Sequence, residues 1–283
     1  MASITDRQGT RRRRGNAAGV RVAFAAALWL AASPVEARPV CMVVASTSGS
    51  ILHEDGDCRT RVTPASTFKL ALSLIGFESG FLTDAHDPVL DHREGEPDWG
   101  GAAWTRPNDP ESWLRHSVVW YSQRIARATG SEELTRYAAS FGYGNADFSC
   151  DPGQDNGLER SWIASSLKIS PVEQVLFLGK LVERRLPVAA SAIDKTIAIT
   201  ESQAIAGWRI SGKTGSAYPR KADRSLDRAR AWGWYVGWAE RDGRTLVFAR
   251  LDQDETHQSV SSGLRARDAL FAEWEALARG LPR

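Results

Sequence analysis

The feature that most constrains this chain is an ordered set of three short motifs that carry hydroxyl and amine side chains. Ser66-Thr67-Phe68-Lys69 comes first, Ser117-Val118-Val119 second and Lys213-Thr214-Gly215 last. One such motif alone means little, because Ser165-Ser166-Leu167-Lys168 also fits the first pattern. The order of the three predicts a fold that brings distant segments together around one reactive serine.

The first motif predicts a nucleophile with its base. A serine hydroxyl attacks only when a base takes its proton, and residues three apart on a helix are neighbours, so Lys69 can reach Ser66. Pro64-Ala65 predicts the entry into a helix over residues 66–79 that Gly80 ends. Ser66 then lies at a helix N-terminus, where free N–H groups favour negative charge. Taken alone, the motif could also be a helix cap beside a solvated lysine.

The second and third motifs add a proton shuttle and a cation. Ser117 offers a second hydroxyl, although a helix N-cap is the alternative for it. Lys213 and Thr214 lie in a predicted strand over residues 208–217 and would line one side of a cleft, while Gly215 leaves room for substrate. Together the motifs indicate serine acyl transfer.

In this order the motifs resemble the penicillin-recognising serine acyltransferases and, more narrowly, the class D (oxacillinase-type) β-lactamases. Further matching segments extend the resemblance from about Val40 to Leu277: Tyr143-Gly144-Asn145, Trp162, Gly233-Trp234-Tyr235-Val236-Gly237-Trp238 and Gly263-Leu264-Arg265. The resemblance implies an α+β fold in which a central antiparallel sheet is flanked by N- and C-terminal helices and carries an inserted all-helical region. It also implies hydrolysis of β-lactams through a Ser66 acyl-enzyme.

Lys69 can act as a base only if its amine is neutral. A free lysine has a pKa of about 10.4, and burial lowers it. The side chains available to line its site are Phe68, Val119, Trp162 and Leu167. In class D enzymes the equivalent lysine is N-carboxylated by carbon dioxide and is the general base for acylation and deacylation, with Trp162 as the residue that shields it. No metal or other cofactor is expected.

The resemblance also assigns the substrate contacts. The backbone N–H groups of Ser66 and Ser216 would form the oxyanion hole, and Ser216 is a departure because many relatives have an aromatic residue there. Arg265 would bind the substrate carboxylate with its guanidinium fork. Thr214, Gly215, Val119 and Leu167 complete the predicted contacts. The alternatives are a surface charge for Arg265, a core position for Trp162 and a simple turn for Tyr143-Gly144-Asn145.

The first 37 residues differ from the rest and predict a secretory signal peptide, hence a secreted, periplasmic protein. Arg11 to Arg14 and Arg21 precede the apolar run Val22 to Ala32, and Val35-Glu36-Ala37 fits a cleavage site. A membrane anchor is the alternative, although the run is shorter than the roughly 20 residues of a span. This segment holds six of the 36 Lys and Arg residues and two of the 34 Asp and Glu residues, so the remainder is near neutral. Such a charge suggests neither nucleic-acid nor membrane partners, and the oligomeric state stays open.

Residues 38–283 are expected to form the catalytic domain. Its sheet part is predicted at about 38–62 and 196–283, with a helical part at about 63–195. Ser170, Pro171 and Glu173 predict a capped helix from 171 to about 184. Other predicted elements are helices over 117–128, 131–140 and 263–279, with Thr129 and Glu132 as a capping box and Gly142 as a stop, and strands over 231–240 and 244–252 joined at Asp242-Gly243.

The three cysteines can be assigned from turn geometry. Residues from Val40 to His53 predict a hairpin, and a two-residue loop at Gly49-Ser50 pairs residues whose numbers sum to 99. Cys41 then lies opposite Cys58, within reach of a disulfide in an oxidising compartment. Cys150 is left unpaired.

Two other functions share most of these motifs. A β-lactam sensor domain acylates without turnover, and the single N-terminal apolar segment speaks against it. A penicillin-binding DD-peptidase usually has a longer chain and lacks the apolar S-x-V context.

Overall fold

The computed structural model describes residues 37–149 and 151–282, so all but the last residue of the predicted signal peptide lies outside the described residues, as does Cys150. The described residues begin with a strand and end after a long helix. No helix among them combines the length and apolar character needed to cross a membrane.

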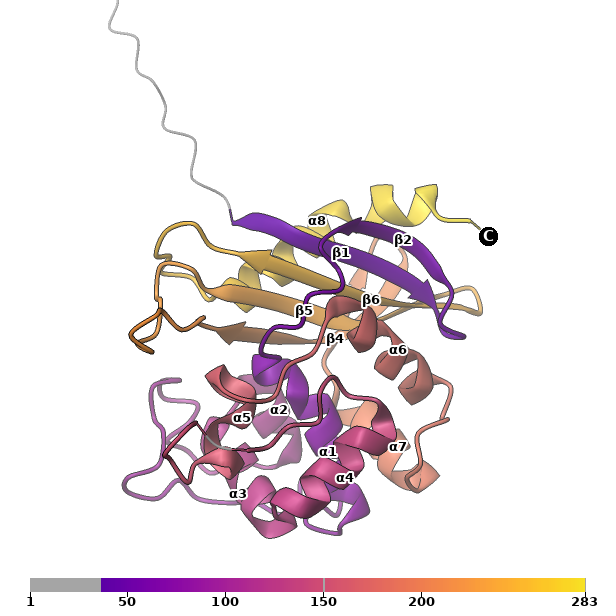
Figure 1. Ribbon diagram of the computed structural model, residues 1–283. Helices are drawn as coiled ribbons and strands as arrows, with labels where there is room; N and C mark the ends of the chain where they lie inside the picture. The colour runs from indigo at the N-terminus through magenta and orange to yellow at the C-terminus, as the bar shows by residue number, and fades with distance from the viewer. Residues whose placement is uncertain (1–36, 150, 283) are drawn as a thin grey trace, which may run out of the picture. The chain divides into compact units, whose positions relative to one another are not determined.

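A six-stranded antiparallel sheet forms the centre of the fold (Figure 1). The strand order across the sheet is β2-β1-β6-β5-β4-β3. The strands are β1 (Arg38–Ser46), β2 (Ile51–Gly56), β3 (Ser202–Ile205), β4 (Trp208–Ala217), β5 (Trp232–Arg241) and β6 (Arg244–Gln253). The first and last parts of the described chain therefore build the sheet together, which confirms the predicted fold class.

The segment between β2 and β3 is helical. It holds η1 (Ala65–Phe68), α1 (Lys69–Glu78), α2 (Pro110–His116), α3 (Val119–Thr129), α4 (Ser131–Phe141), α5 (Gly157–Ala164), α6 (Pro171–Val182) and α7 (Ala190–Ile199). Of these, α6 and η1 contact the sheet, and α8 (Ser262–Gly280) covers the opposite face (Figure 1). The nucleophile turn η1 is thereby held against β4 and β5.

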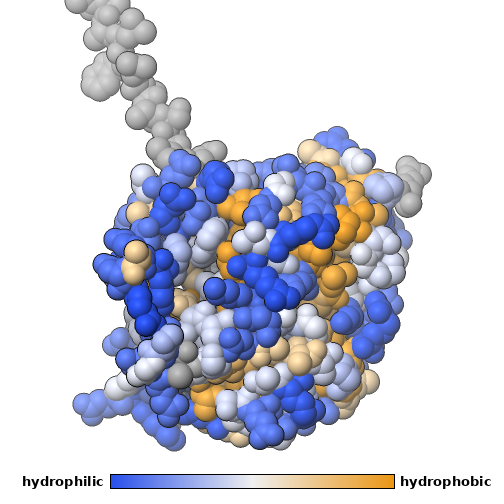
Figure 2. All heavy atoms as spheres, viewed as in Figure 1, coloured by the Kyte–Doolittle hydropathy of each residue, from blue (hydrophilic) through white to orange (hydrophobic). Residues whose placement is uncertain are grey.

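Each face of the sheet has its own apolar core. On the α8 face, Trp208, Phe248 and Trp274 pack together. On the other face, β1, β5 and β6 pack against the helical region, in which Trp113, Trp120 and Phe68 are fully buried. On the face seen in Figure 2, the surface is mainly hydrophilic, with apolar residues in several patches. The large apolar side chains thus fix the sheet between two helical layers.

Strong local signals predict their elements well. The strand predicted over residues 208–217 is β4, with the same bounds. Ser170 caps α6, because its hydroxyl accepts from the Glu173 N–H while the Glu173 carboxylate accepts from the Ser170 N–H. Asp242 and Gly243 form the tight turn between β5 and β6, both with positive φ.

The first hairpin has a different register from the one predicted. Its loop comprises residues 47–49, because the Ser46 N–H donates to the Ser50 carbonyl and the Gly49 N–H donates to the Ser46 carbonyl. A further irregularity follows between Val44 and Ala45, and Cys41 pairs with Gly56. The two-residue loop and the register derived from it are therefore wrong.

The predicted disulfide is nevertheless present. Cys41 and Cys58 are bonded, with their Cα atoms 5.0 Å apart. Cys58 lies beyond the end of β2, where the Asp57 N–H donates to the Val40 carbonyl and keeps the chain beside β1. The bond is thus made by the chain that leaves the hairpin, and not by a cross-strand pair.

A second local prediction is also wrong. Gly130 is the N-cap of α4 and no side chain caps this helix, while the Thr129 hydroxyl donates to the Ile125 carbonyl at the end of α3. The predicted capping box at Thr129 and Glu132 does not form. The stop at Gly142 is confirmed, because this residue ends α4 in the left-handed conformation with φ 71°.

Candidate active site

Ser66 lies on a tight turn at the start of the first long helix. The turn is the short 3-10 helix η1, and Lys69 begins α1. Ala65, which precedes the serine, has a backbone φ of 52°, a conformation that residues other than glycine rarely adopt. The Lys69 Nζ lies 3.4 Å from the Ser66 Oγ. The first motif therefore forms the predicted contact.

The turn is held from two sides. The Thr67 hydroxyl donates to the Pro64 carbonyl at 2.7 Å and accepts from the Gln174 side-chain amide at 2.8 Å. Gly215 of β4 faces the same turn, and a Cβ atom there would lie 3.0 Å from the Pro64 carbonyl oxygen. Glycine at this position therefore allows the turn that carries Ser66 to pack closely against β4. This packing is a second reason for glycine here, beside the predicted room for substrate.

The environment of Lys69 favours a neutral amine. Its side chain is 1% exposed. Burial, and secondarily the charge of Lys213, holds the pKa of Lys69 well below its usual range. A neutral amine 3.4 Å from a serine hydroxyl can accept the proton that the serine must lose.

Aromatic side chains surround the nucleophile helix at this point. The ring centroids of Phe68 and Trp162 are 5.6 Å apart, and Trp162 is 1% exposed. The Thr63 hydroxyl donates to the Trp162 carbonyl at 2.8 Å, which ties Trp162 to the segment just before Ser66. Leu167 is fully buried, and Val119 is nearly so. The four residues predicted to line the Lys69 site are all buried in the same core.

Ser117 and Lys213 form the second hydroxyl–amine pair. Ser117 ends α2 in the left-handed conformation, with φ 56°, and Val118 is the N-cap of α3. The Ser117 hydroxyl is thus free of the capping role considered for it, and it accepts a hydrogen bond from Lys213 Nζ at 2.5 Å. Lys213 also donates to the Thr214 carbonyl at 3.1 Å.

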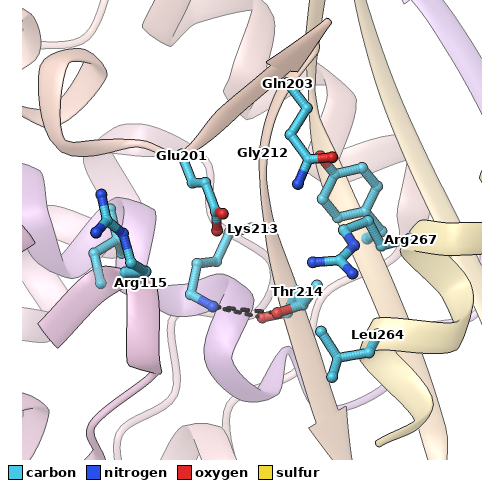
Figure 3. Close-up of a pocket in the computed structure, with 10 residues that line it drawn as sticks. Arg115, Glu201, Gln203, Gly212, Lys213, Thr214, Leu264 and Arg267 are labelled. Atoms are coloured by element: carbon cyan, nitrogen blue, oxygen red, sulfur yellow. Dashed lines mark hydrogen bonds between the residues drawn. The ribbon is translucent and has the colours of Figure 1, made fainter. Parts of the chain in front are cut away.

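Burial lowers the pKa of Lys213 to about 8, because desolvation disfavours the charged amine. The negative charge of Glu201 raises this pKa, and the positive charge of Arg267 lowers it. Figure 3 shows Lys213 in a pocket that Arg115, Glu201 and Arg267 also line. Single charged residues of this kind belong to no motif, so sequence reasoning missed both Glu201 and Arg267.

One cavity of about 580 Å³ collects most of the predicted residues. Its lining includes Ser66, Ser117, Val119, Trp162, Thr214, Gly215 and Ser216. Lys69 and Lys213 lie behind its wall, each within hydrogen-bond reach of one of its serines. Leu167 is buried and does not line the cavity. The size suits a drug-sized ligand.

Ser216 has a structural role that its departure from the family pattern did not suggest. Its hydroxyl accepts from the Gly263 N–H at 2.8 Å and lies 2.7 Å from the Ser261 hydroxyl. These contacts join the end of β4 to the start of α8. The wall of the cavity at this point is therefore polar and fixed.

Arg265 lies away from the cavity lining. Its Nη2 donates to both oxygens of Asp254 at 2.6 Å, and its Nε donates to the Val260 carbonyl at 3.2 Å. The Asp254 carboxylate is 3% exposed, and this residue does line the cavity. The arginine predicted to bind substrate is therefore already paired with a carboxylate of a residue that lines the cavity.

The Tyr143-Gly144-Asn145 segment holds the chain around Leu167. The Asn145 side chain donates to the Ser166 carbonyl and accepts from the Lys168 N–H, each at 2.8 Å. Gly144 has φ 58° and packs against the Lys168 carbonyl, where a Cβ atom would lie at 2.0 Å. Tyr143 is fully buried against Phe68. This segment is thus more than a turn, because it fixes the backbone beside the Lys69 site.

Within residues 37–149 and 151–282, no three His, Cys, Asp or Glu side chains come together in a group that could hold a metal ion. The two serines of the motifs that line the cavity are each paired instead with a buried amine. This set suits nucleophilic acyl transfer.

The chain is similar to known proteins over most of its length. The family model for the penicillin binding protein transpeptidase domain matches residues 42–274. Beta-lactamase OXA-9 of Klebsiella pneumoniae is 38% identical over 252 residues, which cover 88% of this chain and 91% of that protein. Beta-lactamase OXA-1 of Escherichia coli is 34% identical, covering 83% and 84%. The crystal structure of OXA-427, a class D β-lactamase, superposes with a TM-score of 0.80 at 41% identity, covering 86% of this chain and 99% of that one.

Proposed function

This chain belongs to the class D β-lactamase family, and we propose that it hydrolyses β-lactam antibiotics through an acyl-enzyme on Ser66. The observation that carries the proposal is the pairing of Ser66 with a buried amine of lowered pKa, at the wall of a cavity large enough for a β-lactam. The substrate is thus a small molecule, and the protein is a serine β-lactamase.

Acylation begins when Lys69 takes the proton of the Ser66 hydroxyl and the serine oxygen attacks the lactam carbonyl. The N–H groups of Ser66 and Ser216 stabilise the oxyanion that forms. The lactam C–N bond then breaks, and its nitrogen takes a proton from Ser117, which takes one in turn from the charged Lys213 amine. Removing the positive charge of Lys213 would weaken this step.

We also propose that Lys69 is carboxylated by carbon dioxide. The lysine fits the modification, because its amine is buried, its pKa is low and its surroundings are apolar. When present, the carbamate would supply a basic oxygen for acylation and for activating the deacylating water. Trp162 is buried in the same core as Phe68 and lines the cavity, and its indole N–H donates to no described residue, so that N–H is free to hold the group.

We further propose that residues 1–37 direct export and that the mature protein works in the periplasm. The Cys41–Cys58 disulfide supports this location, because such bonds persist in oxidising compartments.

Turnover of a chromogenic cephalosporin, measured beside release of D-alanine from a D-Ala-D-Ala peptide, tests the proposal. A β-lactamase consumes many equivalents of the cephalosporin and leaves the peptide intact. Consumption of a single equivalent would instead identify a β-lactam sensor, and release of D-alanine a penicillin-binding DD-peptidase.

The structure sharpens the test of Arg265. If its remaining N–H groups bind the substrate carboxylate, Arg265→Ala raises the KM for penicillins more than it lowers kcat, because ground and transition states share the contact. We expect about a tenfold rise, measured by steady-state kinetics. An unchanged KM with a lower melting temperature would show that Arg265 serves only to neutralise Asp254.

The alkaline limb of the activity profile should report Lys213. With the pKa of Lys213 at about 8, kcat/KM falls as pH rises through this value and the amine loses its charge. Glu201 raises this pKa, so Glu201→Gln removes a negative charge and moves the limb to lower pH. Rate profiles from pH 5 to 10 measure the shift. A limb that stays in place would show that a group other than Lys213 titrates there.

A further inference from the structure

Three of the most exposed large apolar side chains meet at the catalytic cavity. Among the described residues, Trp99 is 64% exposed, Val260 51% and Leu264 39%, and all three line this cavity. Single exposed apolar residues are ordinary on a protein surface, as Val89 is here. Several around one cavity indicate a site where a ligand covers apolar surface.

Trp99 is fixed at the cavity by the residues that follow it. Its ring centroid lies 5.5 Å from that of Trp104, which is 6% exposed. The indole N–H of Trp104 donates to the His116 carbonyl at 2.9 Å, next to Ser117 of the second motif. A Cβ atom at Gly100 would lie 2.0 Å from the Trp104 ring, so only glycine lets the chain rest on that ring. Trp99 is therefore attached to the catalytic segment.

The exposure of Trp99 is unexplained by packing or by the proposed catalytic steps. Trp104 already fills the core position beneath it, and the reacting groups are hydroxyls and amines. A tryptophan ring buries a large area when a ligand covers it, and it favours another ring in an offset or edge-to-face arrangement. Val260, in the loop before α8, and Leu264, in the first turn of α8, have aliphatic side chains that are smaller than the Trp99 ring.

We propose that Trp99 is a specificity-determining residue that binds an aromatic ring in the acylamino side chain of the substrate. This inference rests on the β-lactamase function proposed above. It predicts a preference for β-lactams with an aryl side chain over those with no acyl side chain, and the preference resides in one side chain outside the three motifs.

Two substrates separate this role from general damage. Benzylpenicillin ends its side chain in a phenyl ring, and 6-aminopenicillanic acid has the same bicyclic nucleus with no acyl group. Trp99→Ala should lower kcat/KM for benzylpenicillin about tenfold and change that for 6-aminopenicillanic acid less than about twofold. Trp99→Phe keeps a ring and should stay within about threefold of wild type on both substrates.

Val89→Ala is the matched control, because Val89 is 60% exposed and lies outside the cavity lining. It should leave both substrates unaffected. Equal losses on the two substrates with Trp99→Ala, or no loss on either, would overturn the inference while the proposed function stands. If the wild-type protein turns over neither substrate, the proposed function fails and the inference fails with it.

Discussion

Ser66→Ala forms no covalent adduct with a penicillin and loses turnover by a factor on the order of 10⁴ or more. The variant removes the only atom that attacks the lactam in the proposed mechanism, while Lys69 and the cavity remain. Its fold should persist, because Ser66 is half-buried and the turn is held by Thr67, Gln174 and Gly215. Intact-mass analysis after incubation with benzylpenicillin measures the adduct directly.

Ser165 provides a matched control for this experiment. It begins the second S-x-x-K segment of the chain, but its hydroxyl donates to Asp151 at 2.8 Å, and it does not line the catalytic cavity. Ser165→Ala should therefore form the adduct and keep turnover, with a loss of stability of about 1 kcal/mol for the hydrogen bond. An adduct on Ser66→Ala would show that another residue is the nucleophile.

The contrast between these two serines shows what the sequence could predict. Both have a lysine three residues later, so local spacing cannot distinguish them. The distinction comes from order along the chain, because an S-x-V segment and a Lys-Thr-Gly strand follow Ser66 at the positions that the family requires. The strand over residues 208–217 and both of its ends could be predicted, because a strand-like pattern of residues runs through the whole segment.

Features that depend on backbone geometry could not be predicted. Ala65 and Ser117 adopt positive φ beside the two reactive hydroxyls, and neither residue type signals that conformation. The register of the first hairpin depends on whether the loop has two or three residues, and Gly49 suits both. The disulfide was predicted correctly from an incorrect register, because the chain beyond β2 returns beside β1.

Contacts between residues far apart in the sequence could not be predicted either, where they shape the part of the cavity expected to bind substrate. Arg265 fits the family position, but its guanidinium bonds to Asp254, a residue whose carboxylate is buried by contacts that no motif describes. Trp99 lies in a segment rich in Pro, Gly, Asp and Trp, and such a composition indicates only a surface loop. Its place at the cavity depends on Gly100 resting on the Trp104 ring.

Trp162→Ala should slow deacylation more than acylation, so that acyl-enzyme accumulates. Trp162 is buried against Phe68, the residue before Lys69, and it also lines the cavity. Its removal admits water, which solvates the charged amine, raises the pKa of Lys69 toward its ordinary value and leaves less neutral amine to react with carbon dioxide. We expect a fall in kcat of about 100-fold, with the acyl-enzyme visible by intact mass during turnover.

Carbon-13 bicarbonate NMR provides a readout apart from activity. Wild-type protein should give a carbamate signal that weakens at acid pH, because protonation of Lys69 removes the neutral amine, and activity should fall in parallel and return with bicarbonate. Trp162→Ala should lose most of the signal. Trp162→Phe keeps an apolar ring without the indole N–H, so an intermediate signal would separate the contribution of shielding from that of hydrogen bonding. A wild-type spectrum with no carbamate signal, together with activity that does not depend on bicarbonate, would mean that Lys69 acts as an unmodified amine. Burial, which lowers the pKa of Lys69, would then be enough by itself to make this amine the base.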